Sequence, residues 1–415
     1  MCILIIGYND NLLAGLDETL PAGSVVLLEE PELWAGRRLA AKAAAHPCLG
    51  DVRFGLYQRH EQYRDVIRDL TAIQAVAPGT EYSVVPAADT AQSLGLPGAG
   101  LPAAMVLRDK LMLREVTASA GLRSPGFREI HSAADVAGFA RGRACVVKPA
   151  QRQASLGVIL LEPGHDPAAA WRECIEADEV AQVANRPMSW RYMVEERLDG
   201  PEFSTECLVR DSEALFLNVT RKRTVPGRHP VESGHLVPGC PAEESDRWRQ
   251  AVKGLIRAVK FDTGILHAEW ILVGEDPVLV ECAGRPPGDR IMDLIDLAYG
   301  VNLNHQWVRL LAGAEVEMPA QAPRGAAIRF LIPGAGTIDR ITGTEEARAA
   351  CGVHRVDLRL KPGDTVAQVA SSWDRVGSVI AVEETADQAE QRAASAAAAI
   401  TVWMTQESTS GEVND

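Results

Sequence analysis

The sequence has too little positive charge for a protein that binds DNA or RNA. Its 42 lysines and arginines are outnumbered by 56 aspartates and glutamates, which gives a formal net charge of −14. Nucleic-acid binding needs a basic face to meet the phosphates, so no nucleic acid is expected as a partner. A nucleotide is not excluded, because a few local cations are enough to hold one.

Long apolar runs and targeting segments are also missing. No stretch approaches the ~18 apolar residues that a membrane-spanning helix needs, so no membrane partner is expected. The N-terminal run MCILIIGYND is too short for a signal peptide and lacks its basic flank. The eight cysteines are scattered without a CxxC pair, which favours free thiols over a disulfide framework or a zinc site. Together these absences predict a cytoplasmic protein.

Lysine is scarce in a chain that uses arginine almost everywhere. A retained lysine is then a candidate for a task that needs a compact point charge. The seven lysines are Lys42, Lys110, Lys148, Lys222, Lys253, Lys260 and Lys361.

Length and patterning predict an α/β (α+β) protein built from several units, because 415 residues are too many for one ordinary domain. The units expected are an N-terminal α/β domain, a central domain with a lid-like part, a small C-terminal α+β domain and a disordered polar tail. They are residues 1–103, 104–316 (lid about 141–198, central part 199–316), 317–405 and 406–415.

Within these units, local patterns predict individual elements. Short apolar runs predict strands at 2–6, 25–28 and 82–85, and no GxGxxG follows the first of them, so a dinucleotide site is not expected there. Apolar spacing predicts one helix over 105–120. Residues 223–240, rich in Pro, Gly and His, are expected to form a long functional loop.

A pair of glutamates in one hairpin gives the strongest physical argument. Two apolar runs flank Gly274-Glu275-Asp276, a three-residue loop with turn chemistry. Counting six residues each way from Glu275 places Glu269 directly opposite Glu281 on one face. Like charges at opposed positions destabilise a sheet, and apolar neighbours make the repulsion worse. A divalent cation such as Mg²⁺ is the simplest compensation.

Other polar residues share that face or follow it. By the same parity His267 and Arg285 point to the side of the two glutamates, and Asp289 is expected to cap a following helix whose N-terminus suits an anion. The alternative is that a bulge shifts the register, or that one glutamate faces solvent at a sheet edge.

Several ordered motifs resemble those of the ATP-grasp ligases. The likeness runs from about residue 80 to residue 405 and is closest to the branch that joins L-amino acids into dipeptides and to carnosine-synthase-like enzymes. It implies an ATP-grasp fold with a Rossmann-like N-terminal domain, a lid and a small C-terminal domain. The motifs are LRDK (107–110), VVKP (146–149), ASLGV (154–158), VEERLDGPEFSTE (194–206), ESGHLVP (232–238), HAEW (267–270) and ECAGRPPGDRI (281–291).

The resemblance implies ATP and Mg²⁺ as cofactors, with two metal ions and Mn²⁺ as a substitute. Glu269 and Glu281 match the metal ligands, while Ala283 stands where asparagine is frequent. Lys110 and Lys148 match the lysines that contact phosphates. The alternative is that both are surface lysines without a role in binding. The remaining nucleotide-binding matches are Ser155, Leu156 and Gly157 in the phosphate loop, Glu195, Glu196 and Leu198 in the adenine hinge, and Glu202 at the ribose.

The same resemblance implies a reaction. Arg285 and Lys148 match catalytic residues, and Gly234, His235, Arg285 and Gly288 match the substrate site, although an ordinary polar loop histidine is an alternative for His235. The implied enzyme activates a carboxylate as its acyl phosphate and couples it to an amine, with release of ADP and phosphate. A carrier protein, a homodimer and a place in natural-product biosynthesis are compatible with this. The rivals are bicarbonate activation, as in biotin-dependent carboxylation, and a non-catalytic nucleotide-binding protein.

Overall fold

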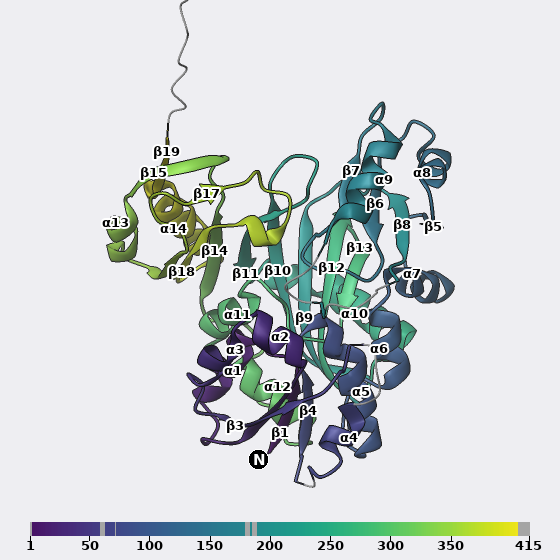
Figure 1. The fold of residues 1–415 in the computed structure, drawn as a ribbon, viewed down its shortest axis with the longest axis vertical. Helices are drawn as coiled ribbons and strands as arrows, with labels where there is room; N and C mark the ends of the chain where they lie inside the picture. Colours follow the sequence, from purple (N-terminus) through teal and green to yellow (C-terminus); the bar gives the residue numbers. More distant parts are fainter. Residues whose placement is uncertain (1, 59–62, 71, 179–182, 185–188, 406–415) are drawn as a thin grey trace, which may run out of the picture.

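The N-terminal part of the chain forms a parallel sheet with helices around it. The computed structural model describes residues 2–58, 63–70, 72–178, 183–184 and 189–405; the tail predicted to be disordered, 406–415, lies outside them. The sheet order is β3-β2-β1-β4, all parallel (purple in Figure 1). Its strands are β1 (Ile3–Ile6), β2 (Val25–Glu29), β3 (Leu49–Phe54) and β4 (Ala75–Pro78).

Two of the three strands predicted in this region are confirmed, and the third is wrong. Residues 82–85 do not form a strand, because a short 3-10 helix (Glu81–Ser83) leads directly into α5 (Val84–Ser93). Thr80 and Ser83 form a capping box there, which starts the helical turn just after β4. The other helices of this region are α1 (Asp10–Asp17), α2 (Pro31–Gly36), α3 (Leu39–Ala43) and α4 (Tyr63–Ile67).

The helix predicted over 105–120 is two helices, α6 (Leu101–Leu107) and α7 (Lys110–Ser119). The break falls at Asp109, whose side chain accepts hydrogen bonds from the backbone N–H groups of Leu111 and Met112 at 2.9 and 3.2 Å. Such an N-cap satisfies donors that a new helix leaves unpaired. Lys110 therefore begins a helix instead of lying in the middle of one.

The lid-like part is an antiparallel sheet with two helices packed against it. The sheet order is β5-β8-β6-β7, formed by β5 (Phe127–Ile130), β6 (Cys145–Pro149), β7 (Ile159–Leu161) and β8 (Tyr192–Glu196). Helices α8 (Ala133–Ala140) and α9 (Pro167–Glu176) contact each other and cover it (Figure 1).

An eight-stranded antiparallel sheet forms the centre of the molecule, in the order β13-β12-β9-β10-β11-β14-β18-β16. It continues across residue 317, because β11 pairs with β14, so the predicted central and C-terminal units share one sheet. The strands are β9 (Glu202–Arg210), β10 (Glu213–Thr224), β11 (Glu232–Val237), β12 (Gly264–Val273), β13 (Asp276–Ala283), β14 (Gly325–Leu331), β16 (Val353–Leu358) and β18 (Gly377–Glu383).

The long loop predicted over 223–240 is interrupted by strand residues. β10 extends to Thr224 and β11 begins at Glu232, so only 225–231 connects them. The remaining elements are the helices α10 (Ser245–Val259), α11 (Ile291–Tyr299), α12 (Leu303–Leu311), α13 (Thr344–Ala349) and α14 (Ala386–Ala399), and a small sheet of β15 (Gly336–Thr342), β17 (Thr365–Val366) and β19 (Thr401–Met404).

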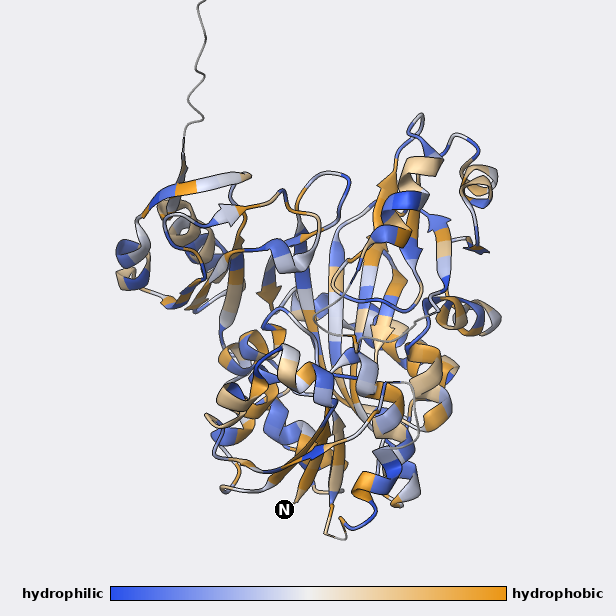
Figure 2. Cartoon of the chain, viewed as in Figure 1, coloured by the Kyte–Doolittle hydropathy of each residue, from blue (hydrophilic) through white to orange (hydrophobic). Residues whose placement is uncertain are grey.

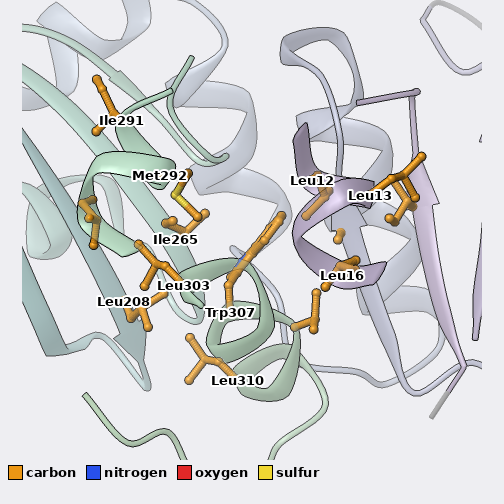
Figure 3. Close-up of a cluster of buried hydrophobic side chains, with 14 of the residues drawn as sticks. Leu12, Leu13, Leu16, Leu208, Ile265, Ile291, Met292, Leu303, Trp307 and Leu310 are labelled. Carbon is orange, nitrogen blue, oxygen red and sulfur yellow. The ribbon is translucent and has the colours of Figure 1, made fainter. Parts of the chain in front are cut away.

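One hydrophobic core joins the N-terminal sheet to the central one. Trp307 on α12 is fully buried between leucines of α1, such as Leu12 and Leu16, and residues of the central part such as Ile265 (Figure 3). Figure 2 shows the strands of the N-terminal sheet as mostly hydrophobic, as expected for a parallel sheet covered on both faces. None of the described helices is both long and apolar enough to cross a membrane.

Candidate active site

A cleft of about 1050 Å³ collects residues from every part of the fold. The N-terminal part contributes the loop after β4, including Glu81, and the lid contributes Lys148 and the β6–β7 connection. Strands β9 to β13 line its floor, and Trp373 and Arg375 come from the C-terminal part. Most of the residues singled out from the sequence therefore meet in one place.

The two hairpin glutamates stand directly opposite each other, as predicted from the sequence. Glu269 on β12 pairs with Glu281 on β13. The turn is shorter than predicted, because the strands continue to Val273 and Asp276, leaving two loop residues. A bulge after Glu269 adds one residue on β13 and restores the predicted pairing. The position of the pair was right, although the three-residue loop was wrong.

Lysines compensate the two carboxylates in the structure. The Lys222 ammonium lies 2.6 Å from a carboxylate oxygen of Glu269 and 3.1 Å from one of Glu232. Lys110 lies 2.9 Å from Glu281. Burial opposes ionisation of Glu269, yet Lys222 holds the pKa of that carboxyl well below its usual range. Burial raises the pKa of Glu202, also in the cleft, to about 7, although the charge of Lys222 opposes this shift.

A buried network fixes Glu269 from behind. His267 is 3.0 Å from Glu206 through Nδ1 and 3.4 Å from Glu269 through Nε2. Glu206 also accepts hydrogen bonds from Ser204, Asn218 and Thr220, at 2.7 to 2.8 Å. Burial alone would lower the pKa of His267, but hydrogen bonds to the two carboxylates raise it to about 9. The imidazolium thus orients a carboxylate that faces the cleft.

Lys148 is held by a buried ion-pair cluster. Its ammonium bonds the carboxylate of Glu195, which also accepts hydrogen bonds from Nη2 and Nε of Arg114 at 3.0 and 3.1 Å. Burial lowers the pKa of Lys148, and Glu195 opposes that shift. The side chain of Glu195 therefore positions Lys148, a role that the hinge assignment did not foresee.

The rest of the predicted adenine hinge lies at the lid side of the cleft. The backbone N–H of Glu196 donates to the carbonyl of Gly126 at 2.8 Å, and its carboxylate accepts from the N–H of Gly126 at 3.0 Å. Leu198 lines the cleft beside it. The assignment of these residues to adenine stays a prediction.

The predicted phosphate loop has an unusual backbone. Ala154, Ser155 and Gly157 have φ values of +56°, +57° and +72°, in the left-handed region that side-chain-bearing residues rarely occupy. Lys110 reaches this loop, because its ammonium donates to the carbonyl of Arg152 at 2.7 Å. This loop with one glycine closes tightly on itself, because the N–H of Leu156 donates to the carbonyl of Gln153 at 3.2 Å, and Leu156 also lines the cleft.

Sequence reasoning missed Glu81, which holds Arg285 in place. The carboxylate of Glu81 is only 3% exposed and accepts hydrogen bonds from Arg285 and Arg108. Burial opposes ionisation, but the two guanidinium groups hold the pKa of Glu81 at about 2. Glu81 lies just past β4, where α/β proteins place functional loops, but the sequence analysis predicted a strand at 82–85 and none at 75–78.

His235 is buried on β11, so the reading of an ordinary loop histidine is wrong. Its Nε2 lies 3.3 Å from Asp289, and Asp289 accepts two further hydrogen bonds from Arg375. Asp289 does not cap α11 as predicted: it has φ +56°, and Arg290 with φ +59° precedes the helix. Arg375, from the C-terminal part, was not foreseen.

The two glycines assigned to the substrate site differ in their surroundings. A Cβ on Gly234 would lie 2.6 Å from the carbonyl oxygen of Ile328, so the close strand pairing requires a residue without a side chain. Gly288 has open space around it and lines the cleft.

Comparisons with known proteins agree with this architecture. Residues 142–293 match the model of the ATP-grasp domain, and residues 329–405 match L-amino acid ligase C-terminal domain 2. The L-amino acid ligase from Bacillus licheniformis superposes with a TM-score of 0.78 at 19% identity, covering 97% of this chain and 98% of that one. A phosphoribosylglycinamide synthetase from Anaerococcus prevotii gives 0.69 at 15% identity, covering 97% and 99%.

The relatives found by sequence match a smaller share of this chain than the solved structures do. Protein y4rH of Sinorhizobium fredii is 29% identical over 319 residues, which are 73% of this chain and 63% of that protein. The alanine–anticapsin ligase of Bacillus amyloliquefaciens is 24% identical over 274 residues, 61% of this chain and 57% of that protein. The matched part thus spans less than two thirds of the length of these relatives.

Proposed function

Because this chain belongs to the ATP-grasp superfamily, on the branch of the L-amino acid ligases, we propose that it activates one amino acid as its acyl phosphate and joins it to the amine of another. The products would be an amide, ADP and phosphate. The motif resemblance and the mixed α/β fold predicted from the sequence are confirmed by the same matches.

The observation that carries the proposal is the pair of opposed glutamates in the cleft that also holds Lys148 and Arg285. Two carboxylates are hard oxygen ligands, and no described group of three or more histidine, cysteine or carboxylate side chains is arranged to hold a metal alone. This donor set suits Mg²⁺, which combines one or two carboxylates with substrate phosphates and water. Glu269 and Glu281 would hold the ion, whose charge neutralises phosphate oxygens when it is bound.

The chain's own cations supply the remaining positive charge. Lys148 is buried and fixed by Glu195, so it presents its ammonium without further ordering. Lys110 and Lys222 form ion pairs with Glu281 and Glu269, respectively. Phosphoryl transfer depends mainly on positioning and electrostatic stabilisation, and several preorganised cations in a shielded cleft provide both.

The reaction then needs no covalent enzyme intermediate. A carboxylate oxygen of the first substrate attacks the γ-phosphorus, and the bond to ADP breaks. The amine nitrogen of the second substrate attacks the acyl carbon, phosphate leaves, and the amine loses a proton. Arg285, held by Glu81, is placed to neutralise charge on the phosphoryl group or on a substrate carboxylate. Cys282 next to Glu281 is an unsuitable nucleophile, because burial raises the pKa of its thiol.

Several finer points of the proposal rest on the resemblance. They are a second metal ion, Mn²⁺ as a substitute, a homodimer and a role in natural-product assembly with a carrier-bound substrate; the cytoplasmic location is proposed from the sequence composition instead. Free amino acids are the simplest substrates, since the matched relatives include proteins named as amino acid ligases.

Hydroxylamine trapping tests the activation step directly. In the presence of ATP, Mg²⁺ and a single amino acid, hydroxylamine should intercept the acyl phosphate and give a hydroxamate with an equal amount of ADP. ADP formation that depends on biotin and bicarbonate, without hydroxamate, would favour bicarbonate activation instead. ATP binding with no ADP from any acid would favour the non-catalytic reading.

A further inference from the structure

A short segment of the C-terminal part reaches into the cleft. We call residues 370–375 the strap; it lies between β17 and β18 and includes a 3-10 helix, Ser372–Asp374. In Figure 1 this yellow-green stretch extends away from the small C-terminal sheet toward β10 and β11. Sequence analysis assigned no role to it, although it contributes several residues to the lining of the cleft.

The strap has a fixed internal conformation. The carboxylate of Asp374 accepts hydrogen bonds from the backbone N–H groups of Ala370 and Ser371, at 2.9 and 2.7 Å, and from the Ser371 hydroxyl at 3.0 Å. This capping box closes the turn with hydrogen bonds made inside the strap. The side chain between the two ends, Trp373, is therefore presented from a rigid base.

Contacts at both ends tie the strap to the catalytic parts of the cleft. The Ser372 hydroxyl donates to Glu232 at 2.7 Å, and Glu232 is the second partner of Lys222. Arg375 donates to Asp289 at 2.8 Å, and its guanidinium lies 3.8 Å from the centre of the Phe330 ring. The strap is thus two side-chain contacts away from the lysine that bonds the predicted metal ligand.

Trp373 is only partly covered by the rest of the protein. It is 42% exposed although its neighbours in the strap are anchored. Exposing a large apolar ring to water is unfavourable, and such residues mark binding sites when they lie in a concave surface. The same cleft is also lined by other apolar residues, namely Val225, Pro226, Pro230, Phe330 and Leu358.

We propose that Trp373 is a specificity-determining residue that contacts the apolar side chain of one of the two amino-acid substrates. The inference rests on the proposed function, because it assigns a substrate class to the same cleft. A ring on a rigid turn offers contact area at little entropic cost. Two charged groups tied to the strap are already paired, Arg375 with Asp289 and Glu232 with Lys222, so neither presents an unpaired charge to an apolar side chain.

Binding measurements test this without depending on turnover. Calorimetry in the presence of MgADP would compare leucine, phenylalanine and glycine on the wild type and on Trp373→Ala. We expect the wild type to prefer leucine and phenylalanine, and the variant to bind them about tenfold more weakly, the size of one or two lost methylene contacts. Glycine and MgADP should bind as before, and Trp373→Phe should retain most of the preference.

Trp403→Ala is the matched control, because Trp403 is 45% exposed in the same C-terminal part and does not line the cleft. The inference is overturned if the wild type binds glycine as tightly as leucine and phenylalanine or binds none of them. It is also overturned if Trp373→Ala weakens MgADP instead, or if Trp403→Ala has the same effect. Loss of the apolar preference in Trp373→Ala without coupling of any amino-acid pair would contradict the proposed function, but it would still place an apolar amino acid against Trp373.

Discussion

Replacing Lys222 by methionine should make the stability of the protein depend on Mg²⁺. In the structure the Lys222 ammonium lies among the carboxylates of Glu202, Glu232 and Glu269, with contacts of 2.6 Å to Glu269 and 3.1 Å to Glu232. The electrostatic attraction of these groups raises the pKa of Lys222 despite its burial. Methionine keeps the length of the side chain and removes the charge.

The expected loss in the free energy of unfolding follows from removing only one partner of a buried ion pair. Removing one partner leaves uncompensated charge and costs about 3–5 kcal/mol, which should lower the melting temperature of a chain of this length by roughly 3–6 °C. Mg²⁺ bound by Glu269 would restore part of this, because a ligand present at about ten times its Kd adds roughly 1.4 kcal/mol. The variant should therefore gain more from Mg²⁺ than the wild type does.

Thermal unfolding with and without millimolar Mg²⁺ measures this difference. Lys253→Met is the control, because Lys253 is an exposed lysine on α10. Equal Mg²⁺ responses in Lys222→Met, Lys253→Met and the wild type would refute the reasoning that these carboxylates form a metal site.

Three further predictions concern other buried charges. Arg285→Lys should lower kcat for ADP release by about 100-fold while ATP affinity stays within a few-fold, because the planar fork is lost; steady-state kinetics with unchanged kcat would contradict this. Glu81→Gln should lower the free energy of unfolding by about 3–5 kcal/mol, because Arg108 and Arg285 lose their carboxylate partner. A clearly smaller loss in denaturant unfolding would contradict this. Burial raises the pKa of Asp296 to about 7, so the free energy of unfolding should fall as pH rises from about 4 to 7. Asp296→Asn should remove on the order of 3 kcal/mol of that dependence, whereas an unchanged pH profile would show that Asp296 titrates normally.

The position of the hairpin pair could be predicted from the sequence because strand parity depends only on local chain geometry. Glu269 and Glu281 are equally distant from Glu275, and that count placed them opposite each other. The count succeeded although the turn has two residues, because the bulge after Glu269 adds the missing one. A bulge depends on neighbouring strands, so the hairpin sequence alone does not reveal it.

Residues joined by contacts far apart in sequence were not predictable in the same way. Glu81 meets Arg285, 204 positions away, and Arg375 meets Asp289, 86 positions away. Neither pairing follows from a local pattern. Lys222 is different, because the scarcity of lysine already made it a candidate functional residue. The structure buries it among three carboxylates, so the sequence did contain a signal for this residue.

The hinge assignment shows how a motif can place a residue correctly and leave its task open. Glu195 lies at the lid side of the cleft, as the resemblance implied. Its carboxylate, however, is occupied by Lys148 and Arg114. A sequence gives no sign of which groups a side chain will meet, since that depends on how α7 packs against β8.

The most direct test of the account is ADP release with ATP and Mg²⁺ against amino acids supplied singly and in pairs, with products identified by mass. The account predicts turnover that requires particular pairs and yields a mass equal to the two amino acids less one water. Arg285→Lys would serve as the impaired control. A protein that binds ATP but gives neither pair-dependent ADP nor such a product would contradict the assignment as an amino acid ligase.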